Sequence, residues 1–586
     1  MNKETKQCKN CKNEFVIEPD DFAFYEKIDV PPPTWCPGCR SMRRLTWRNE
    51  RAFYRHTCDL CEKSIISNLD PSMGRKVYCN KCWWSDKWDP MEYGREYDFS
   101  RPFFEQFNEL ASKVPWVNLW GFSNTNADYA NYIAYSKNVY LSSSVVSSEN
   151  IYYSYSVDKS RDVFDTFIAD ESELVYECVD VGQVHSVMFA SRSHQCLSSY
   201  FLYDCVNCQN CFMSSNLRNK KYYFRNKLLT KEAYENKMKN IDFTSYCAVA
   251  ELKEEHTDLI RTALHKFANI TNSTDATGDD IEGSKNIHQS FIVKNSENIK
   301  YSWRLPGEMK DCYDISGALQ SELVYEGVVA ANHNYRVRFY SQFRDSKDCS
   351  YCVMGKKNTN VFGCVGIQNK QYCILNKQYT KEAYEELIPK VIAHMDEKPY
   401  VDKKGREYRY GEFFPTELSP FAYNESVAYE YFPLLKEEAE REGYRWKDTD
   451  VKSHKITKNP QELPDRITDV DNSILNETIA CEHKGTCSHQ CSTAFKIIPE
   501  ELKFYRRINF PLPRLCPNCR HYQRLKQRNP LKLWHRQCMC DYEVYENTTK
   551  HQHHSDGRCP NEFETTYSPE RKETVYCEQC YNAEIV

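Results

Sequence analysis

Glycine, long apolar runs and a leader segment are scarce or missing in this chain, and each absence excludes a class of protein. Only 18 of the 586 residues are glycine, about 3 % against a usual ~7 %, so a fold built on many glycine turns is disfavoured. No run of 18 apolar residues exists, which predicts no transmembrane helix and no membrane partner. The opening segment MNKETKQCKNCKNEF lacks the apolar stretch of a signal peptide, so we expect a cytoplasmic protein.

Charge of one sign and catalytic signatures are also missing. Lys and Arg total 78 against 83 Asp and Glu, for a formal net charge of −5, which argues against a uniformly basic nucleic-acid coat protein and leaves room for local basic faces. The sequence has no P-loop, no GxGxxG, no HExxH and no GxSxG pattern. We therefore expect a non-enzymatic protein.

Cysteine is abundant, with 29 residues, and without an export signal these are expected to be thiols or metal ligands. The first eight occur as four pairs with a two-residue spacer, which aims two sulfurs at one ion and suits tetrahedral Zn²⁺. We predict one site from the first two pairs and a second from the next two, with interleaved ligation as the alternative. The ligands are Cys8, Cys11, Cys36 and Cys39, then Cys58, Cys61, Cys79 and Cys82.

The C-terminus repeats this module. The segment from Phe15 to Asn49 matches the segment from Phe495 to Asn529 at an offset of 480 residues. The predicted ligands of the third and fourth sites, which bring the zinc count to about four, are Cys487, Cys491, Cys516 and Cys519, then Cys538, Cys559, Cys577 and Cys580.

Two departures leave ligands of these sites open. The first pair has a three-residue spacer, so His489 or Cys481 could replace Cys487. An insertion brings Cys540, which could compete with Cys559, and a cluster formed by His551, His553 and His554. We interpret that cluster as a solvated loop, with metal binding as the alternative.

The middle of the chain repeats every twelve residues. SKNVYLSSSVVS, SENIYYSYSVDK, SRDVFDTFIADE and SELVYECVDVGQ follow one another from 136, and a second block of similar units begins at 284. Units this short must stack on neighbours to bury a face. The sequence therefore predicts a mostly β fold, with a β-solenoid-like region of ~12-residue repeats in two tandem halves. Treble-clef or zinc-ribbon-like modules with short helices flank it, and an antiparallel meander is the alternative for the middle.

Most cysteines of the middle fall on repeat positions that suit small interior residues. Cys205, Cys208 and Cys211 could instead form a metal knuckle, and the tyrosines at the fifth position are expected to stack on the surface. The predicted organisation is a double-zinc module 1–100, connector 101–123, first block with closing helix 124–240, helix and acidic linker 241–283, second block with closing helix 284–398, aromatic connector and linker 399–480, and second double-zinc module 481–586.

A basic run follows the CPxC pair in both modules. Guanidinium groups grip phosphates and aromatic rings stack on unpaired bases, so these runs predict nucleic-acid contacts. The alternative is that the arginines pair with acidic surfaces of the solenoid. The residues are Arg40, Arg43, Arg44, Arg48, Arg51 and Arg55, then Arg520, Arg524, Lys526, Arg528, Lys532 and Arg536.

These motifs also carry a resemblance. The runs CPGCRSMRRLTWRN, YCNKCWWSDKWDPMEYGREYDFSRPFFEQF, YGEFFPTELSPFAYNE, CPNCRHYQRLKQRNPLKLWHRQC and VYCEQCY resemble those of a family of large uncharacterised bacterial proteins, over nearly the whole chain. The resemblance implies duplicated CPxCR zinc modules around a repetitive middle region, with no established activity.

The expected function is a zinc-stabilised scaffold that binds RNA, DNA or a ribonucleoprotein through the basic helices of its terminal modules. A second hypothesis is a protein-interaction or self-associating assembly scaffold built on the solenoid. The third is a carbohydrate-acting solenoid enzyme, for which Asp162 with Asp165 and Asp170 with Glu171 are candidate carboxylate pairs.

Overall fold

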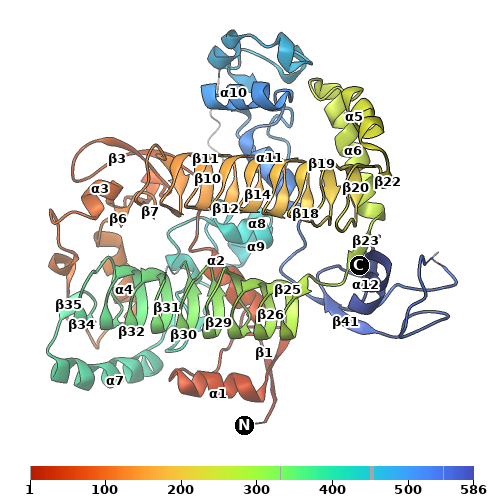
Figure 1. The fold of residues 1–586 in the computed structure, drawn as a ribbon. Coiled ribbons are helices and arrows are strands. Elements are labelled where there is room, and N and C mark those ends of the chain that lie inside the picture. Colours follow the sequence, from red (N-terminus) through yellow and green to blue (C-terminus); the bar gives the residue numbers. More distant parts are fainter. Residues whose placement is uncertain (1, 330–331, 449–454, 545–546) are drawn as a thin grey trace.

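A computed structural model describes residues 2–329, 332–448, 455–544 and 547–586. Two stacks of short parallel strands lie side by side and run in opposite directions along the molecule (Figure 1). The N-terminal and C-terminal modules lie around them, and strands predominate over helices among the regular elements. No helix among the described residues is both long and apolar enough for a membrane span.

The first stack contains β7 to β22, and its strands pair in parallel at the sequence period, except for the closing antiparallel pair of β21 and β22. Lys137 lies opposite Glu149 and Glu149 opposite Arg161, each twelve residues on. Parallel pairing excludes the antiparallel meander for these strands. The strands are β7 (Gly121–Phe122), β8 (Tyr129–Asn131), β9 (Ile133–Ala134), β10 (Lys137–Val146), β11 (Glu149–Tyr152), β12 (Tyr155–Asp158), β13 (Arg161–Phe164), β14 (Phe167–Asp170), β15 (Glu173–Tyr176), β16 (Val179–Gly182), β17 (His185–Met188), β18 (Ser191–His194), β19 (Leu197–Tyr203), β20 (Phe212–Ser215), β21 (Tyr223–Phe224) and β22 (Lys227–Leu228).

The second stack contains β24 to β35 and begins earlier than predicted. The segment 271–283 is not a linker, because β25 within it pairs in parallel with β26. The strands are β24 (Ile270–Thr271), β25 (Thr274–Glu282), β26 (Lys285–Lys294), β27 (Glu297–Lys300), β28 (Trp303–Leu305), β29 (Lys310–Ser316), β30 (Glu322–Val328), β31 (Tyr335–Arg344), β32 (Lys347–Lys356), β33 (Thr359–Phe362), β34 (Gln371–Ile374) and β35 (Lys377–Gln378).

The turns of the first stack use left-handed residues that are not glycine. Asn138, Asn150 and Asp162 have φ between 55° and 59°, a region that Asn and Asp tolerate better than other residues with a Cβ. Their side chains form a ladder, because the Asn138 amide donates to Asn150 at 2.8 Å and the Asn150 amide donates to Asp162 at 2.8 Å. A serine ladder runs beside it, with the Ser160 N–H donating to the Ser148 hydroxyl at 3.0 Å. These ladders explain how a glycine-poor sequence turns so often.

The interior of each stack is narrow and is filled by valine, isoleucine and cysteine at repeat positions. Ile151, Val163 and Val175 are fully buried in the first stack. Cys178 is also buried, and its thiol lies 3.4 Å from the Tyr176 carbonyl oxygen. Burial raises the pKa of Cys178 to about 12, so this thiol stays protonated. Cys205, Cys208 and Cys211 are likewise buried, with sulfurs facing backbone carbonyls of the same stack.

Helices close both stacks. The predicted closing helices are α5 (Lys231–Lys239) and α7 (Lys381–Glu397), whose first N–H groups donate to the hydroxyls of the N-caps Thr230 and Thr380. The helix predicted within 241–283 is α6 (Tyr246–Thr262), and β23 (Leu264–Lys266) follows it. The predicted connector 101–123 contains α4 (Phe103–Lys113) and β6 (Trp116–Val117).

The terminal modules begin with short hairpins and knuckle helices. In the N-terminal module these are β1 (Glu4–Gln7), β2 (Glu14–Ile17), α1 (Pro19–Lys27), α2 (Pro37–Leu45), β3 (Tyr54–Thr57), β4 (Ser64–Ser67), β5 (Val77–Tyr78) and α3 (Asn80–Trp83). In the C-terminal module they are β38 (Ile479–Ala480), β39 (Ala494–Phe495), α10 (Pro499–Ile508), α11 (Pro517–Leu525), β40 (Trp534–Gln537), β41 (Glu562–Thr565), β42 (Thr574–Tyr576) and α12 (Glu578–Ile585).

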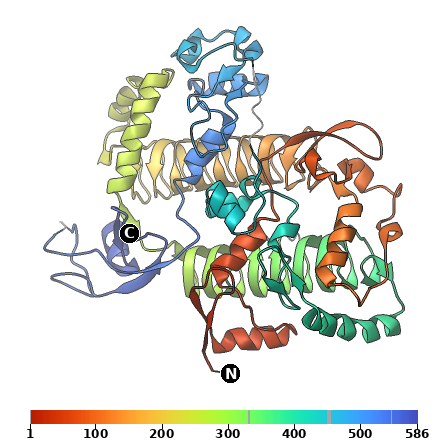
Figure 2. The ribbon, with the colours of Figure 1, turned by 180° about the vertical axis from the view of Figure 1, so that it is seen from behind.

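Each module contacts both stacks. β5 pairs in parallel with β6, which leads into the first stack, while α2 packs on β29 and β30 of the second stack. In the C-terminal module β42 pairs in parallel with β23, which leads into the second stack, while α11 packs on β14 of the first. Both views place α2 between the stacks with α8 (Val427–Tyr431) and α9 (Lys436–Arg441) of the aromatic connector (Figures 1 and 2). The fold is therefore two related halves, each cross-linked to the other by a terminal module.

Candidate metal centres and the groove between the stacks

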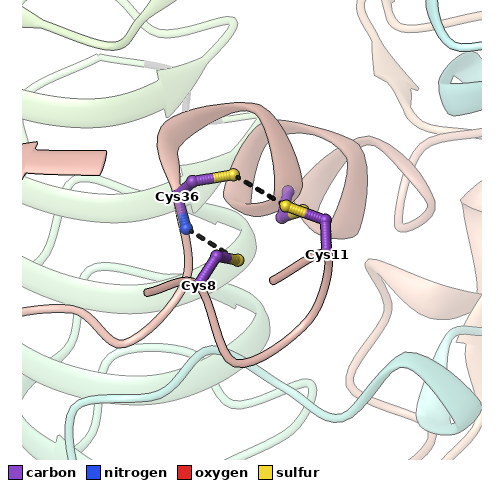
Figure 3. Close-up of side chains that lie close together, drawn as sticks. Cys8, Cys11 and Cys36 are labelled. Atoms are coloured by element: carbon purple, nitrogen blue, oxygen red, sulfur yellow. Dashed lines mark hydrogen bonds between the residues drawn. The ribbon is translucent and has the colours of Figure 1, made fainter. Parts of the chain in front are cut away.

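The first predicted quartet comes together where the β1–β2 hairpin meets the start of α2. Cys8, Cys11, Cys36 and Cys39 form a group whose sulfurs lie within 4.8 Å of one another. The sulfurs of Cys11 and Cys36 are 3.7 Å apart, and the Cys36 N–H donates to the Cys8 sulfur at 3.2 Å (Figure 3). Cys36 is the N-cap of α2 with Pro37 at the first helical position, so the positive helix end favours thiolate there.

The second quartet, Cys58, Cys61, Cys79 and Cys82, also comes together, without interleaving with the first. The sulfurs of Cys61 and Cys79 are 3.9 Å apart. Burial acts to raise the pKa of the Cys58 thiol, but backbone N–H groups, that of Cys79 foremost, bring it down to about 7. A thiol of this kind is readily deprotonated, as a metal ligand must be.

The third quartet differs from the predicted one. Cys481 joins Cys491, Cys516 and Cys519, and its sulfur is 3.8 Å from that of Cys519. Cys487 does not belong to this quartet, because the wider loop places it beside His483 and His489, on the other side of Cys519. The open alternative of Cys481 replacing Cys487 is therefore the one that the structure favours.

The fourth quartet, Cys538, Cys559, Cys577 and Cys580, agrees with the predicted set. The inserted histidine cluster is not a solvated loop, because His551 is only 2 % exposed and packs against Cys540. His553 faces the quartet, with its Nε2 3.3 Å from the Cys580 sulfur. All four quartets offer the sulfur ligands that suit zinc.

The basic run of the N-terminal module is mostly buried against the second stack. Asp314 accepts from Arg40 and from Arg44, each at 2.8 Å. Glu326, twelve residues further on, accepts from Arg43 at 3.1 Å and Arg44 at 3.2 Å. All five of these side chains are at most 2 % exposed. Although burial opposes it, Glu326 and Glu412 raise the pKa of Arg43.

The C-terminal module repeats this junction on the first stack. Arg524 pairs with Asp165 at 3.0 Å, and Arg520 pairs with Asp165 and with Glu501. Asp165 lies 149 residues before Asp314, and it is fully buried. Asp165 was one of the candidate carboxylates for sugar cleavage. That assignment is wrong, because Asp165 lies in the interior and forms an ion pair there.

The remaining basic residues are distributed differently. Arg48 pairs with Glu50 in the interior, and Arg528 pairs with Asp280 at 2.9 Å. Arg51 donates to Asn518 at 2.9 Å. Six of the twelve predicted nucleic-acid contacts remain wholly or partly exposed, namely Arg51, Arg55, Lys526, Arg528, Lys532 and Arg536. The first part of each predicted basic run is therefore a buried ion-pair junction rather than an open surface. The predicted aromatic stack of the first block is partly covered too, since Phe504 of α10 stacks on Phe164 at 3.7 Å.

A groove of about 740 Å³ lies between the start of the first stack, the N-terminal module and the middle of the second stack. The aromatic residues that line the groove come from the start of the first stack and from the N-terminal module. Apart from Arg48, its basic residues come from the second stack. The aromatic residues are Trp84, Trp120, Phe122, Tyr132 and Tyr135, and the basic ones beside Arg48 are Arg304, Arg344, Lys356 and Lys357.

Arg48 pairs with Glu50 and Arg304 donates to Ser144 and Ser156, whereas three other cations of this groove, Arg344, Lys356 and Lys357, have no ion pair among the described residues. Arg344 is only 8 % exposed, and its Nε has no hydrogen-bond partner. Its guanidinium carbon lies over Phe122, 4.5 Å from the ring centroid, and over Trp84 at 5.5 Å. Burial lowers the pKa of Arg344, and burial together with Arg344 lowers the pKa of Lys356. Asp345 is the one carboxylate among the described residues of the lining.

No family model matches the chain, and no curated protein matches it. The resemblance to a bacterial zinc-module family is therefore not confirmed by these comparisons.

The groove was not predicted from the sequence. Pairing of the arginines with acidic surfaces of the solenoid was one of the predicted alternatives, but the carboxylates of either junction were not identified. The groove brings together residues more than 200 positions apart in the sequence, such as Trp84 and Arg344. No local sequence pattern could therefore predict it. A signal for the junction did exist, because an acid directly after the aromatic position recurs as Asp165 and Glu177 in one block and Asp314 and Glu326 in the other.

Proposed function

We propose that this chain is a zinc-stabilised scaffold in which two β-solenoids, held side by side by the terminal modules, bind single-stranded nucleic acid in the groove between them. One zinc ion in each of the four thiolate quartets fixes the knuckle helices. In-register parallel pairing every twelve residues supports the solenoid assignment, because equivalent residues then recur at the strand spacing.

The buried arginines support the scaffold role. Helix α2 joins a metal quartet to two successive coils of a solenoid, because Arg44 pairs with Asp314 and Glu326. Helix α11 joins another quartet to one coil of the other solenoid, because Arg524 pairs with Asp165. Each module also pairs a strand with the segment leading into the other solenoid. Zinc thereby sets the relative position of both solenoids and the width of the groove.

The binding proposal depends on one observation, which is that this groove holds unpaired cations beside aromatic rings. Phosphates neutralise such cations, and bases stack on exposed rings. Tyr135 is 63 % exposed at the rim, with its ring 5.2 Å from Phe122. A phosphate near Arg344 and Lys356 with a base on Tyr135 meets both requirements.

Binding of a fluorescent single-stranded RNA across a salt titration tests this. Lys356→Ala with Lys357→Ala should weaken binding and reduce the slope of log K against log salt by about 1.4, since each lost phosphate contact contributes about 0.7. Tyr135→Ala should weaken binding roughly tenfold, because a stacked base contributes about 1–3 kcal/mol.

The matched control is Lys310→Ala with Lys347→Ala, which removes two exposed cations of the same solenoid outside the groove. This control should leave the slope unchanged. Equal weakening by both double variants, or no binding by the wild type at low salt, refutes the groove as the site.

A further inference from the structure

The C-terminal module contains a second set of metal ligands beside each of its thiolate quartets. Next to the third quartet lie His483, Cys487 and His489, which form a four-ligand group with Cys519 of that quartet. Next to the fourth lie Cys540, His551 and His554, which contact one another in that order, and His554 in turn contacts Cys580 of that quartet. We propose that both quartets are halves of two-metal centres, in which Cys519 and Cys580 each bridge two zinc ions through one thiolate.

The distances around Cys580 fit a tetrahedral ion. Zn–S bonds of about 2.3 Å and Zn–N bonds of about 2.0–2.1 Å place tetrahedral ligands about 3.5 Å apart for S and N and about 3.3 Å apart for two nitrogens. The Cys540 sulfur is 3.5 Å from His551 Nδ1, and His551 Nδ1 is 3.3 Å from His554 Nε2. His554 Nε2 is 3.5 Å from the Cys580 sulfur.

The surroundings of His551 match those of a metal ligand. Its other ring nitrogen, Nε2, lies 2.9 Å from a carboxylate oxygen of Glu584. Zinc-binding histidines commonly donate their second N–H to a carboxylate, which directs the free nitrogen at the ion. Glu584 is held in turn by the Thr548 N–H at 2.8 Å.

The set beside the third quartet has the same composition. The Cys487 sulfur is 3.7 Å from that of Cys519, the separation expected of two thiolates on one zinc ion. His489 is 6 % exposed, and its Nδ1 has no hydrogen-bond partner. The Nδ1 of His483 is also buried without a partner, so these imidazoles have free nitrogens beside a thiolate.

Charge gives a reason for the second ion. One zinc ion bound by four thiolates has a net charge of −2. Two zinc ions bound by five thiolates and two neutral imidazoles have a net charge of −1 for the whole two-metal centre. Burying less net charge costs less free energy. The N-terminal module offers no such set, because its eight cysteines are all used in two quartets and His56 is its one histidine.

Native mass spectrometry of the zinc-saturated full-length chain tests the proposal. We expect six zinc ions in the wild type, five in His551→Ala with His554→Ala, and five in His483→Ala with His489→Ala. The control His56→Ala should keep six. Circular dichroism of each variant establishes that the chain is folded before its ions are counted.

A second measurement keeps the proposal testable if a histidine variant fails to fold. Cobalt substitution of the wild-type chain should give absorption of two mixed sulfur–nitrogen sites besides the all-sulfur sites. A wild-type count of four at zinc saturation, or six ions that persist in both histidine variants, overturns the proposal. This outcome is independent of RNA binding, which the groove variants report.

Discussion

Arg44→Met removes one guanidinium group from the buried junction between α2 and the second stack. In the wild type this group donates to Asp314 at 2.8 Å and to Glu326 at 3.2 Å, and none of the three side chains is more than 1 % exposed. Breaking a buried ion pair by removing one partner costs about 3–5 kcal/mol. In the variant Arg40 and Arg43 still pair with these carboxylates. We therefore expect the free energy for release of α2 to fall by the lower end of this range, about 3 kcal/mol.

Native-state hydrogen exchange measures that release directly. A cost of about 3 kcal/mol corresponds to roughly 10²-fold faster exchange of amides in α2 and in the facing strands β29 and β30. The control is Lys526→Met at the end of the equivalent helix α11, where the side chain is exposed and the expected change is within about 0.5 kcal/mol. Exchange of α2 within threefold of the wild type refutes the junction as the anchor of the knuckle helix.

Three further predictions follow from other parts of the molecule. Stripping metal with a chelator should expose α2 and α11 to protease while far-UV circular dichroism keeps the β signal, and unchanged cleavage contradicts a role for the quartets. Cys481→Ser should speed exchange in α11 more than Cys487→Ser does, since only Cys481 belongs to the quartet; the reverse order contradicts the assignment. Burial, reinforced by Asp279, raises the pKa of Asp280 from 3.8 to about 7. The folded state then holds a proton that the unfolded state has released, so stability falls as pH rises through this range, by up to about 1.4 kcal/mol per pH unit. Asp280→Asn should remove this component from melting curves, and a pH-independent difference between variant and wild type contradicts it.

Charge reversal of the buried arginines is a poor test of nucleic-acid binding. An Arg44→Glu or Arg524→Glu variant places a third carboxylate in a buried junction, so it reports on folding. Exposed groups are the informative positions, namely Lys357 and Tyr135 in the groove and Lys526 and Lys532 in the module.

Local features of the sequence predicted the strand pairing and three of the four cysteine groups that could hold a metal ion. The spacing from Cys8 to Cys39 and from Cys58 to Cys82 places both pairs of each quartet within one short hairpin-and-helix unit. The twelve-residue period determines the register of the stacks, because stacking like residues on like residues buries the same face in every coil.

Structural features that depend on residues far apart in the sequence were not predicted, or were predicted wrongly. The acidic segment 271–283 has the composition of a linker, yet Asp275 and Asp280 occupy left-handed turn positions of strand segments. The basic runs were open to two interpretations because the partners of Arg44 lie about 270 and 280 residues away. Cys481 was one of two alternatives, since the spacer alone does not say which way the loop folds.

Ultraviolet crosslinking of a single-stranded RNA to the full-length chain, with the adducts mapped by mass spectrometry, shows whether the RNA binds in the groove. The proposed groove predicts adducts on Tyr135, Phe122 and Trp84, which line it, and their loss in the Lys356→Ala, Lys357→Ala variant. Adducts confined to Trp534 beside Lys532 in the C-terminal module, with none in the groove, would contradict it.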